Sequence, residues 1–285
     1  MLRIMLSVLI CLVSAAEAYS GQSTITEAQG YACMGIEKSR QQTEQAAMAE
    51  AKKNAASQAA TYVKSETTVK NFQVEEDMMN AYSLATVKIL ETLESRWVKD
   101  ERAGECFRVR IKADVVPDEK AMKDIAGGKF ASDDPGLPLH VTLSSEKKEY
   151  RSGEKMKIYM KGNKPFYARV LYRNSKGEFL QLLPNPYREE NYFQGGVIYE
   201  IPAGNDRYDL EVTPPFGEEG VVLYASTSPL GAIKLKKEGG VYQVKTEADD
   251  IGVKTRGVKI VGSTGKKEQR ASEFYEGTLV VKTRE

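Results

Sequence analysis

The segment Phe107-Arg108-Val109-Arg110-Ile111-Lys112-Ala113-Asp114-Val115 alternates apolar and charged residues without a break. A period of two places the apolar side chains on one face of a β-strand and the charged ones on the other. A less regular strand signal precedes it at 89–98, and the connecting residues 99–105 contain Gly104, as in a hairpin loop. We therefore expect two antiparallel strands with one face buried in a core.

A long helix is predicted upstream, at 39–66. Its small apolar residues recur at three- and four-residue steps, which indicates a buried face: Ala46, Ala49, Ala56, Ala59, Ala60 and Val63. Small side chains on that face allow a helix to lie close to a sheet. With a shorter helix predicted at 74–84 and an opening strand at 24–34, the region 19–126 is expected to form an α+β domain. Its helices would cover an antiparallel sheet.

The start of the chain has the features of a secretory signal peptide. The basic start Met1-Leu2-Arg3 precedes the apolar run 4–13, and Ala16-Glu17-Ala18 matches an A-x-A cleavage signal. We expect residues 1–18 to be removed after Ala18, because the apolar run is too short to cross a bilayer. No later stretch approaches about 18 consecutive apolar residues, so no transmembrane segment is expected. The mature protein is predicted to be periplasmic or secreted.

Removal of the signal peptide leaves two cysteines, Cys33 and Cys106. An even pair in an exported protein indicates a disulfide, and the strand at 24–34 would carry Cys33 toward Cys106. The alternative is a pair of buried or reactive thiols.

The composition changes after a Gly/Asp/Pro-rich linker at 127–138. The region 139–285 is rich in Gly, Pro, Tyr and Val and reads as short strands separated by turns. The predicted strands are 139–144, 155–160, 167–173, 179–183, 197–201, 208–212 and 220–226, with a final strand at 277–283. Strands at this spacing favour an all-β sandwich domain.

Two stretches resemble known families. The layout from Gly30-Tyr31-Ala32, through the Ala-rich helix, to Cys106-Phe107-Arg108-Val109 resembles LPP20-type lipoproteins and the N-terminal domain of the flagellar assembly protein FlgT. Those relatives are cell-envelope proteins without known catalysis in this domain, which implies an envelope role. The chain lacks the lipid-anchoring cysteine typical of the first family, which argues against membrane tethering.

The second resemblance lies in the β-rich region. The stretch Tyr150-Arg151-Ser152-Gly153-Glu154-Lys155-Met156-Lys157-Ile158 resembles the opening of bacterial Ig-like sandwiches. Together with Leu182-Leu183-Pro184-Asn185-Pro186-Tyr187 and Tyr208-Asp209-Leu210, it looks most like domain of unknown function 4384. That family has no established catalytic residues, so the resemblance implies an accessory or interaction role.

The charge balance excludes some functions. With 41 Lys+Arg against 40 Asp+Glu, the formal net charge is +1, which gives no overall attraction to nucleic acid or anionic lipid. His140 is the only histidine, so a multi-histidine metal site is excluded, although carboxylate or cysteine ligand sets stay open. No motif supplies His140 with a catalytic partner. We expect no cofactor, no metal and no catalytic residue.

The segment 184–193 is the best candidate for a partner-binding site. It combines three aromatic rings with an arginine, a composition enriched at protein interfaces: Tyr187, Arg188, Tyr192 and Phe193. The alternative is that these side chains pack within their own loop.

The sequence thus predicts an exported, non-enzymatic cell-envelope protein that acts as a protein-interaction or assembly module. Its partner would be an envelope or surface-appendage protein. Two alternatives stay open: an exported hydrolase with a carboxylate-based site in the interdomain cleft, because such residues need not be close along the chain, and a small-ligand-binding accessory protein.

Overall fold

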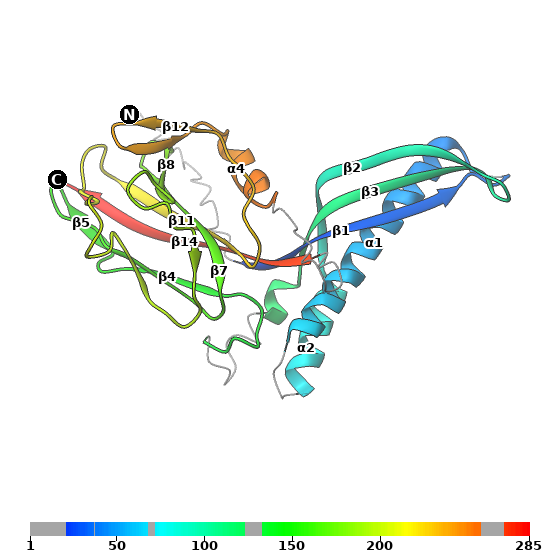
Figure 1. Ribbon diagram of the computed structural model, residues 1–285, viewed down its shortest axis with the longest axis horizontal. Coiled ribbons are helices and arrows are strands. Elements are labelled where there is room, and N and C mark those ends of the chain that lie inside the picture. The colour runs from blue at the N-terminus through cyan, green and yellow to red at the C-terminus, as the bar shows by residue number, and fades with distance from the viewer. Residues whose placement is uncertain (1–20, 37, 68–71, 123–132, 258–270) are drawn as a thin grey trace, which may run out of the picture.

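The computed structural model describes residues 21–36, 38–67, 72–122, 133–257 and 271–285. A long arm projects from a broader body (Figure 1). The predicted signal peptide at 1–18 and the linker residues 127–132 lie outside the described residues.

The arm is a three-stranded antiparallel sheet covered on one face by helices. Its strands lie in the order β1 (Gly21–Cys33), β3 (Gly104–Val116) and β2 (Thr86–Asp100). Helix α1 (Arg40–Glu66) runs along the sheet, and α2 (Phe72–Ser83) follows it near the body (Figure 1). The apolar residues of the alternating segment 107–115 face α1 and form the core of the arm.

Helix α1 begins at a capping box, because the Ser39 hydroxyl accepts from the Gln42 backbone and the Gln42 side chain accepts from the Ser39 backbone. Its buried side chains are spaced four residues apart throughout: Thr43, Ala47, Ala51, Ala55, Ala59 and Val63. Of the alanines predicted to be buried, Ala59 belongs to this set, whereas the others lie beside it. The regular four-residue step keeps one narrow stripe of small side chains against the sheet.

The closest approach of α1 to the sheet is at Gly30 of β1. A Cβ atom added at Gly30 would lie 1.9 Å from the carbonyl oxygen of Ala47 and 2.5 Å from the backbone nitrogen of Ala51. Only glycine leaves room for the helix backbone at this point. The small residues on both elements therefore set the distance between helix and sheet.

The body contains strands of two to fourteen residues, most of them paired antiparallel, and the helix α4 (Ala248–Thr255). Its strands are β4 (Val141–Ser145), β5 (Glu149–Arg151), β6 (Ile158–Gly162), β7 (Phe166–Arg173), β8 (Phe179–Leu183), β9 (Tyr192–Phe193), β10 (Tyr199–Ile201), β11 (Glu218–Ser226), β12 (Leu235–Glu238), β13 (Val241–Val244) and β14 (Ala271–Arg284). The strands β10, β6 and β4 form a separate three-stranded sheet. Its apolar residues pack with those of β7 and β11 in one core that includes Ile158, Phe166 and Leu223.

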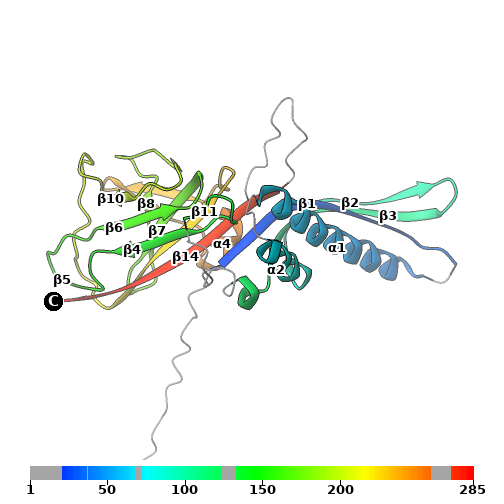
Figure 2. The same cartoon turned by 90° about the horizontal axis from the view of Figure 1, so that it is seen from below.

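One curled sheet runs through both the arm and the body. Its order is β12-β13-β8-β7-β11-β14-β1-β3-β2, so β14 lies between β11 of the body and β1 of the arm. Residues Gly21–Thr26 of β1 pair with Ala271–Glu276 of β14. Figure 2 shows β14 leading from the body to the base of the arm. The last strand of the chain thus joins the two regions.

The structure confirms a β-rich, mostly antiparallel fold with few helices. Several details differ from the sequence predictions. The predicted strand at 208–212 is reduced to a single bridge between Glu211 and Lys155, and the predicted final strand at 277–283 is the end of the longer β14. The hairpin β12–β13 and α4 were not predicted. Among the described residues, no helix is long and apolar enough to cross a membrane.

Candidate functional site

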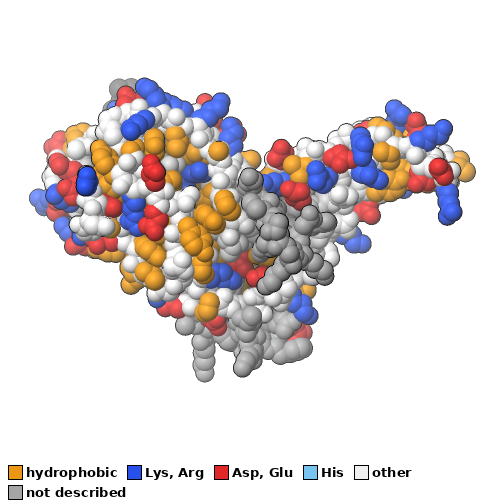
Figure 3. Space-filling view, in the orientation of Figure 1, with side chains coloured by type: hydrophobic (Ala, Val, Ile, Leu, Met, Phe, Trp, Pro, Cys, Tyr) orange, Lys and Arg blue, Asp and Glu red, His pale blue; other side chains and the backbone are white. Residues whose placement is uncertain are grey.

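The exposed face of the arm is the most distinctive surface for binding. Side chains alternate along each strand, so one set faces α1 and the other set lies on the opposite face. Near the tip of the arm this second face is exposed at Gln29 and Tyr31 of β1, Arg108 of β3 and Arg96 of β2. We call Gln29, Tyr31, Arg96 and Arg108 the tip face. Figure 3 shows basic and acidic side chains interspersed along the arm.

Two arginines of the tip face are direct neighbours. The register places Arg108 opposite both Tyr31 on β1 and Arg96 on β2. Like charges directly opposite each other on adjacent strands are unfavourable. Arg96 is compensated by Glu94, whose carboxylate lies 2.7 Å from its Nε. The guanidinium of Arg108 instead lies over the Tyr31 ring, 5.8 Å from the centroid, and no carboxylate of the described residues forms an ion pair with it.

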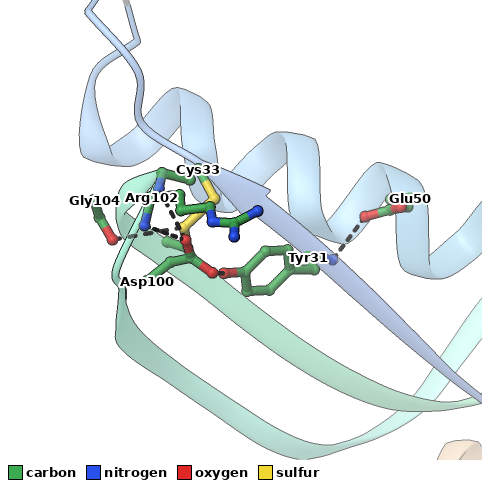
Figure 4. The surroundings of a disulfide bond; sticks show 8 residues. Tyr31, Cys33, Glu50, Asp100, Arg102 and Gly104 are labelled. Atoms are coloured by element: carbon green, nitrogen blue, oxygen red, sulfur yellow. Dashed lines mark hydrogen bonds between the residues drawn. A yellow bond between two sulfur atoms is a disulfide. The ribbon is translucent and has the colours of Figure 1, made fainter.

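A disulfide fixes the end of the arm. Cys33 and Cys106 are paired in the β1–β3 register and are joined by a bond across 73 residues of sequence (Figure 4). This confirms the predicted disulfide and excludes the alternative of two free thiols in this structure. The bond holds β1 and β3 together beside Tyr31 and Arg108, and so limits the movement of the tip face.

The neighbouring hairpin turn is held by Asp100. Its carboxylate accepts hydrogen bonds from the backbone N–H groups of Arg102 and Ala103, at 2.9 and 2.8 Å, and from the Tyr31 hydroxyl at 3.4 Å (Figure 4). The two backbone hydrogen bonds lower the pKa of Asp100, and the one from Ala103 has the larger effect. Partial burial and the nearby Asp100 carboxylate raise the pKa of Tyr31. Asp100 is therefore ionised and Tyr31 neutral at physiological pH.

A shallow polar hollow of about 530 Å³ lies beside the tip face. It is lined by β1, α1 and the end of the β2–β3 hairpin, through Gln29, Gly30, Tyr31, Glu50, Asn54, Asp100 and Arg108. Its walls offer hydrogen-bond donors, acceptors and one aromatic ring, which suits a polar, extended ligand such as a peptide segment.

The first turn of α1 holds the other face of the tip. The Trp97 ring packs on Phe107 with centroids 5.3 Å apart, and its Nε1 donates to Glu44 at 3.1 Å. The guanidinium of Arg40 lies 4.6 Å from the centre of the Trp97 ring and also pairs with Glu105 at 2.8 Å. The tip face is therefore supported from behind by packed side chains.

The predicted partner-binding residues lie in the body and are divided between surface and core. Tyr187 is 51% exposed and stacks on Tyr208, and Tyr192 is 43% exposed and packs on Tyr167. Phe193 is fully buried in the body core, so its ring is not available to a partner.

Arg188 is mostly enclosed within the same loop. Its Nη1 donates to the Glu200 carbonyl at 3.0 Å, and its guanidinium lies near Asp206 and over the Phe193 ring. Arg188 and Phe193 therefore take part in loop packing, and Tyr187 and Tyr192 are the members that remain accessible.

His140 lies just before β4, with its ring 5.0 Å from the Tyr275 ring in an edge-on contact. Burial lowers the pKa of His140, so it is neutral at physiological pH. This environment is that of a packed side chain.

Carboxylates distant in sequence do meet where the arm joins the body. Arg256 contacts Asp114 of β3 at 3.0 Å and Glu276 of β14 at 2.5 Å. Burial raises the pKa of Asp114 and of Glu276, and the Arg256 charge opposes both shifts. Asp114 is almost fully buried. Because both acids share one arginine, the group forms a buried ion-pair cluster rather than an open pair of carboxylates.

Sequence reasoning missed the tip face, although one signal was present. The alternation at 107–115 already placed Arg108 on the polar side of a strand. The proximity of Tyr31, Arg96 and Arg108 depends on the register of three strands, which the sequence pattern does not specify.

The comparisons with known proteins concern the body. Residues 149–229 match a family described as a domain of unknown function, DUF4384. This range begins at β5, ends shortly after β11, and includes the residues that carried the second resemblance. No curated protein and no solved structure matches the chain.

Proposed function

We propose that the protein is an exported, non-enzymatic component of the cell envelope that acts as a protein-interaction or assembly module. The tip face is its main binding surface, and the observation that carries this proposal is the arginine–tyrosine group at the end of a braced, projecting arm. The partner is an envelope or surface-appendage protein.

The chemistry of the tip face supports this proposal. Tyrosine and arginine are enriched among the residues that contribute most to protein–protein binding. Arg108 has no carboxylate partner in the described part of the chain, and it lies opposite Arg96. A partner carboxylate placed between these guanidinium groups would relieve their repulsion and form charge-assisted hydrogen bonds.

The rigidity of the arm also supports a binding role. The disulfide, the Asp100 turn and the Trp97 contacts fix the backbone on which Tyr31 and Arg108 stand. A surface that is already ordered loses less conformational entropy on association.

Export and architecture are part of the same proposal. The signal-peptide pattern at 1–18 supports a periplasmic or secreted location, and the disulfide is typical of proteins in oxidising compartments. We interpret the arm as an α+β domain similar to LPP20-type lipoproteins and the FlgT N-terminal domain, and the body as an Ig-like sandwich. These similarities support an envelope role and supply no catalytic residues.

The body provides a second, smaller candidate surface. Tyr187 and Tyr192 keep about half of their side chains exposed, while Tyr187 stacks on Tyr208 and Tyr192 packs at a tilt against Tyr167. Exposed tyrosine rings whose positions are fixed by a second ring are suited to a further protein contact. The buried state of Asp114 and its pairing with Arg256 support a structural role for the carboxylates at the junction rather than hydrolysis.

The proposal is tested by affinity capture from envelope extracts. We expect the wild-type protein to retain a partner that the double variant Y31A/R108A loses. The matched control, Y187A/K237A, removes an exposed tyrosine and an exposed cation from the body and should retain it. Loss of the partner by the control but not by Y31A/R108A would move the binding surface to the body. If neither the wild type nor either variant retained a partner, the proposal would be overturned.

A further inference from the structure

Half of β1 forms an open edge of the sheet. β14 pairs with β1 only over Gly21–Thr26, whereas β3 pairs with it from Thr24 to Cys33. Along residues 27–33 no described strand lies on the side of β1 away from β3. An edge with free N–H and C=O groups is a template for pairing with another strand.

Two side chains of α1 reach over this open edge. Glu50 accepts a hydrogen bond from the Tyr31 backbone N–H at 2.7 Å, and Asn54 donates to the Gln29 backbone carbonyl at 2.8 Å. Four residues further along α1, Gln58 accepts from the Thr26 hydroxyl at 3.2 Å. The three polar residues thus form a stripe beside the alanine stripe that packs on the sheet.

The two backbone bonds have the pattern of a missing parallel strand. In a parallel ladder, the residue opposite Gly30 would donate its N–H to the carbonyl of Gln29 and accept from the N–H of Tyr31. Asn54 supplies that donor and Glu50 supplies that acceptor. These side chains therefore occupy the bonds through which a parallel strand would attach.

The topology of the arm provides a strand in the required direction. β1 and β2 each pair antiparallel with β3, so β1 and β2 run parallel to one another at the two edges of the arm. If two arms lay side by side in the same orientation, β2 of one copy would lie parallel to β1 of the next. The described part of the chain places no further strand beyond β2.

We propose that Glu50 and Asn54 prevent another strand from pairing with the open half of β1. The pairing that they prevent is head-to-tail addition of β2 from a second copy. Such a contact joins unlike edges, so each added copy again presents a free edge, and the sheet would extend from copy to copy into a ring or an open filament. The irregular pairing of β2 at Ile89/Glu91 and Thr92/Glu94 is a further feature that makes edges poor partners.

The test is the oligomeric state of the E50A/N54A variant, measured by sedimentation velocity over a range of protein concentrations. We expect the wild type to remain monomeric. The variant's average mass should rise about twofold or more with concentration, because the smallest product of such pairing is a dimer. The control Q41A/Q45A removes two exposed amides of α1, also four residues apart, and should remain monomeric.

A proline on β2 separates strand pairing from general aggregation. Gln29 and Tyr31 direct their backbone groups away from β3, so Gly30 is the residue that hydrogen-bonds to its partner Val109. The backbone groups of Val109 therefore point toward β1. Ser95, which lies opposite Val109 on β2, directs its N–H away from β3 and toward the outer edge. S95P removes this outward donor without removing a β2–β3 bond. We expect E50A/N54A/S95P to be monomeric. A monomeric E50A/N54A variant would overturn the proposal, as would a triple variant that still associates.

Discussion

At the scale of single residues, the arm depends on groups that fit only one environment. Gly30 admits the backbone of α1, and Arg108 is placed without a carboxylate partner among the described residues. The buried acids of the junction are a third case, because Asp114 and Glu276 both form ion pairs with Arg256. Each of these groups can be altered without removing a whole element.

Gly30 provides the first prediction. In an ordinary strand, replacing glycine with alanine is favourable, but here the new Cβ would collide with the α1 backbone at Ala47. We expect G30A to lower the free energy of unfolding by about 1–3 kcal/mol, the usual cost of overpacking a core. Urea denaturation measures this change. The control G204A, where no atom lies within 4 Å of the added Cβ, should stay within about 0.5 kcal/mol of wild type.

Asp114 provides a prediction about pH. Burial raises its pKa above the ordinary value of 3.8, so the folded state binds this proton more tightly than the unfolded state does. The stability that Asp114 contributes is therefore greatest below pH 3.8, the ordinary pKa, and is lost as the pH rises through the raised pKa of the folded state. Asparagine cannot ionise, so D114N should become more stable relative to wild type as the pH rises from about 4 to 7. Urea denaturation across this range checks the trend, and the opposite slope would contradict it.

At the scale of elements, α1 combines two functions in neighbouring stripes. Its alanines set the distance to the sheet, and Glu50 and Asn54 close the edge of β1. The β2–β3 hairpin is likewise fixed from two sides, by Trp97 against α1 and by the disulfide on the opposite face. The tip face is therefore a property of the joined elements and not of one strand.

The disulfide provides the prediction at this scale. Removing it with C33S/C106S releases a long loop in the unfolded chain, for which the chain-entropy estimate is about 4 kcal/mol. We expect the midpoint of urea denaturation to fall by a corresponding amount. Wild-type protein treated with a reductant should approach the variant, whereas the variant should not respond. Equal midpoints for oxidised wild type and variant would show that the bond does not stabilise the arm.

The success of sequence reasoning also differs between elements. The segment 107–115 was predicted as a two-faced strand because its pattern is local, and the pairing of Cys33 with Cys106 followed from compartment and strand order. The start of β14 was missed because its pairing partner, β1, lies at the other end of the chain. For the same reason the four residues of the tip face could not be grouped from the sequence.

At the scale of the whole molecule, the continuous sheet is the main finding. β14 pairs with β11, β5 and β1, so strands of both the arm and the body depend on it. The ion pairs of Arg256 add a second link, because they join β3 of the arm to β14. The arm and the body are therefore mechanically coupled, through the shared strand β14 and the ion pairs of Arg256.

This coupling predicts that the arm and the body unfold together. Trp97 is the only tryptophan and reports on the arm, whereas ten tyrosines between 150 and 242 give a near-ultraviolet signal dominated by the body. We expect tryptophan fluorescence and tyrosine circular dichroism to change at the same urea concentration, as in a single cooperative transition. A tryptophan transition at clearly lower urea would indicate that the arm unfolds separately.

Binding of the partner at the tip of the arm can be mapped in cells by site-specific photocrosslinking. A photoreactive amino acid is placed at Gln29 or Arg96 on the arm, or at Tyr187 on the body, all of which are exposed. We expect the two arm positions to crosslink to the same envelope or appendage protein, and Tyr187 not to crosslink to that protein. Crosslinks from Tyr187 alone, or from none of the three positions, would contradict it.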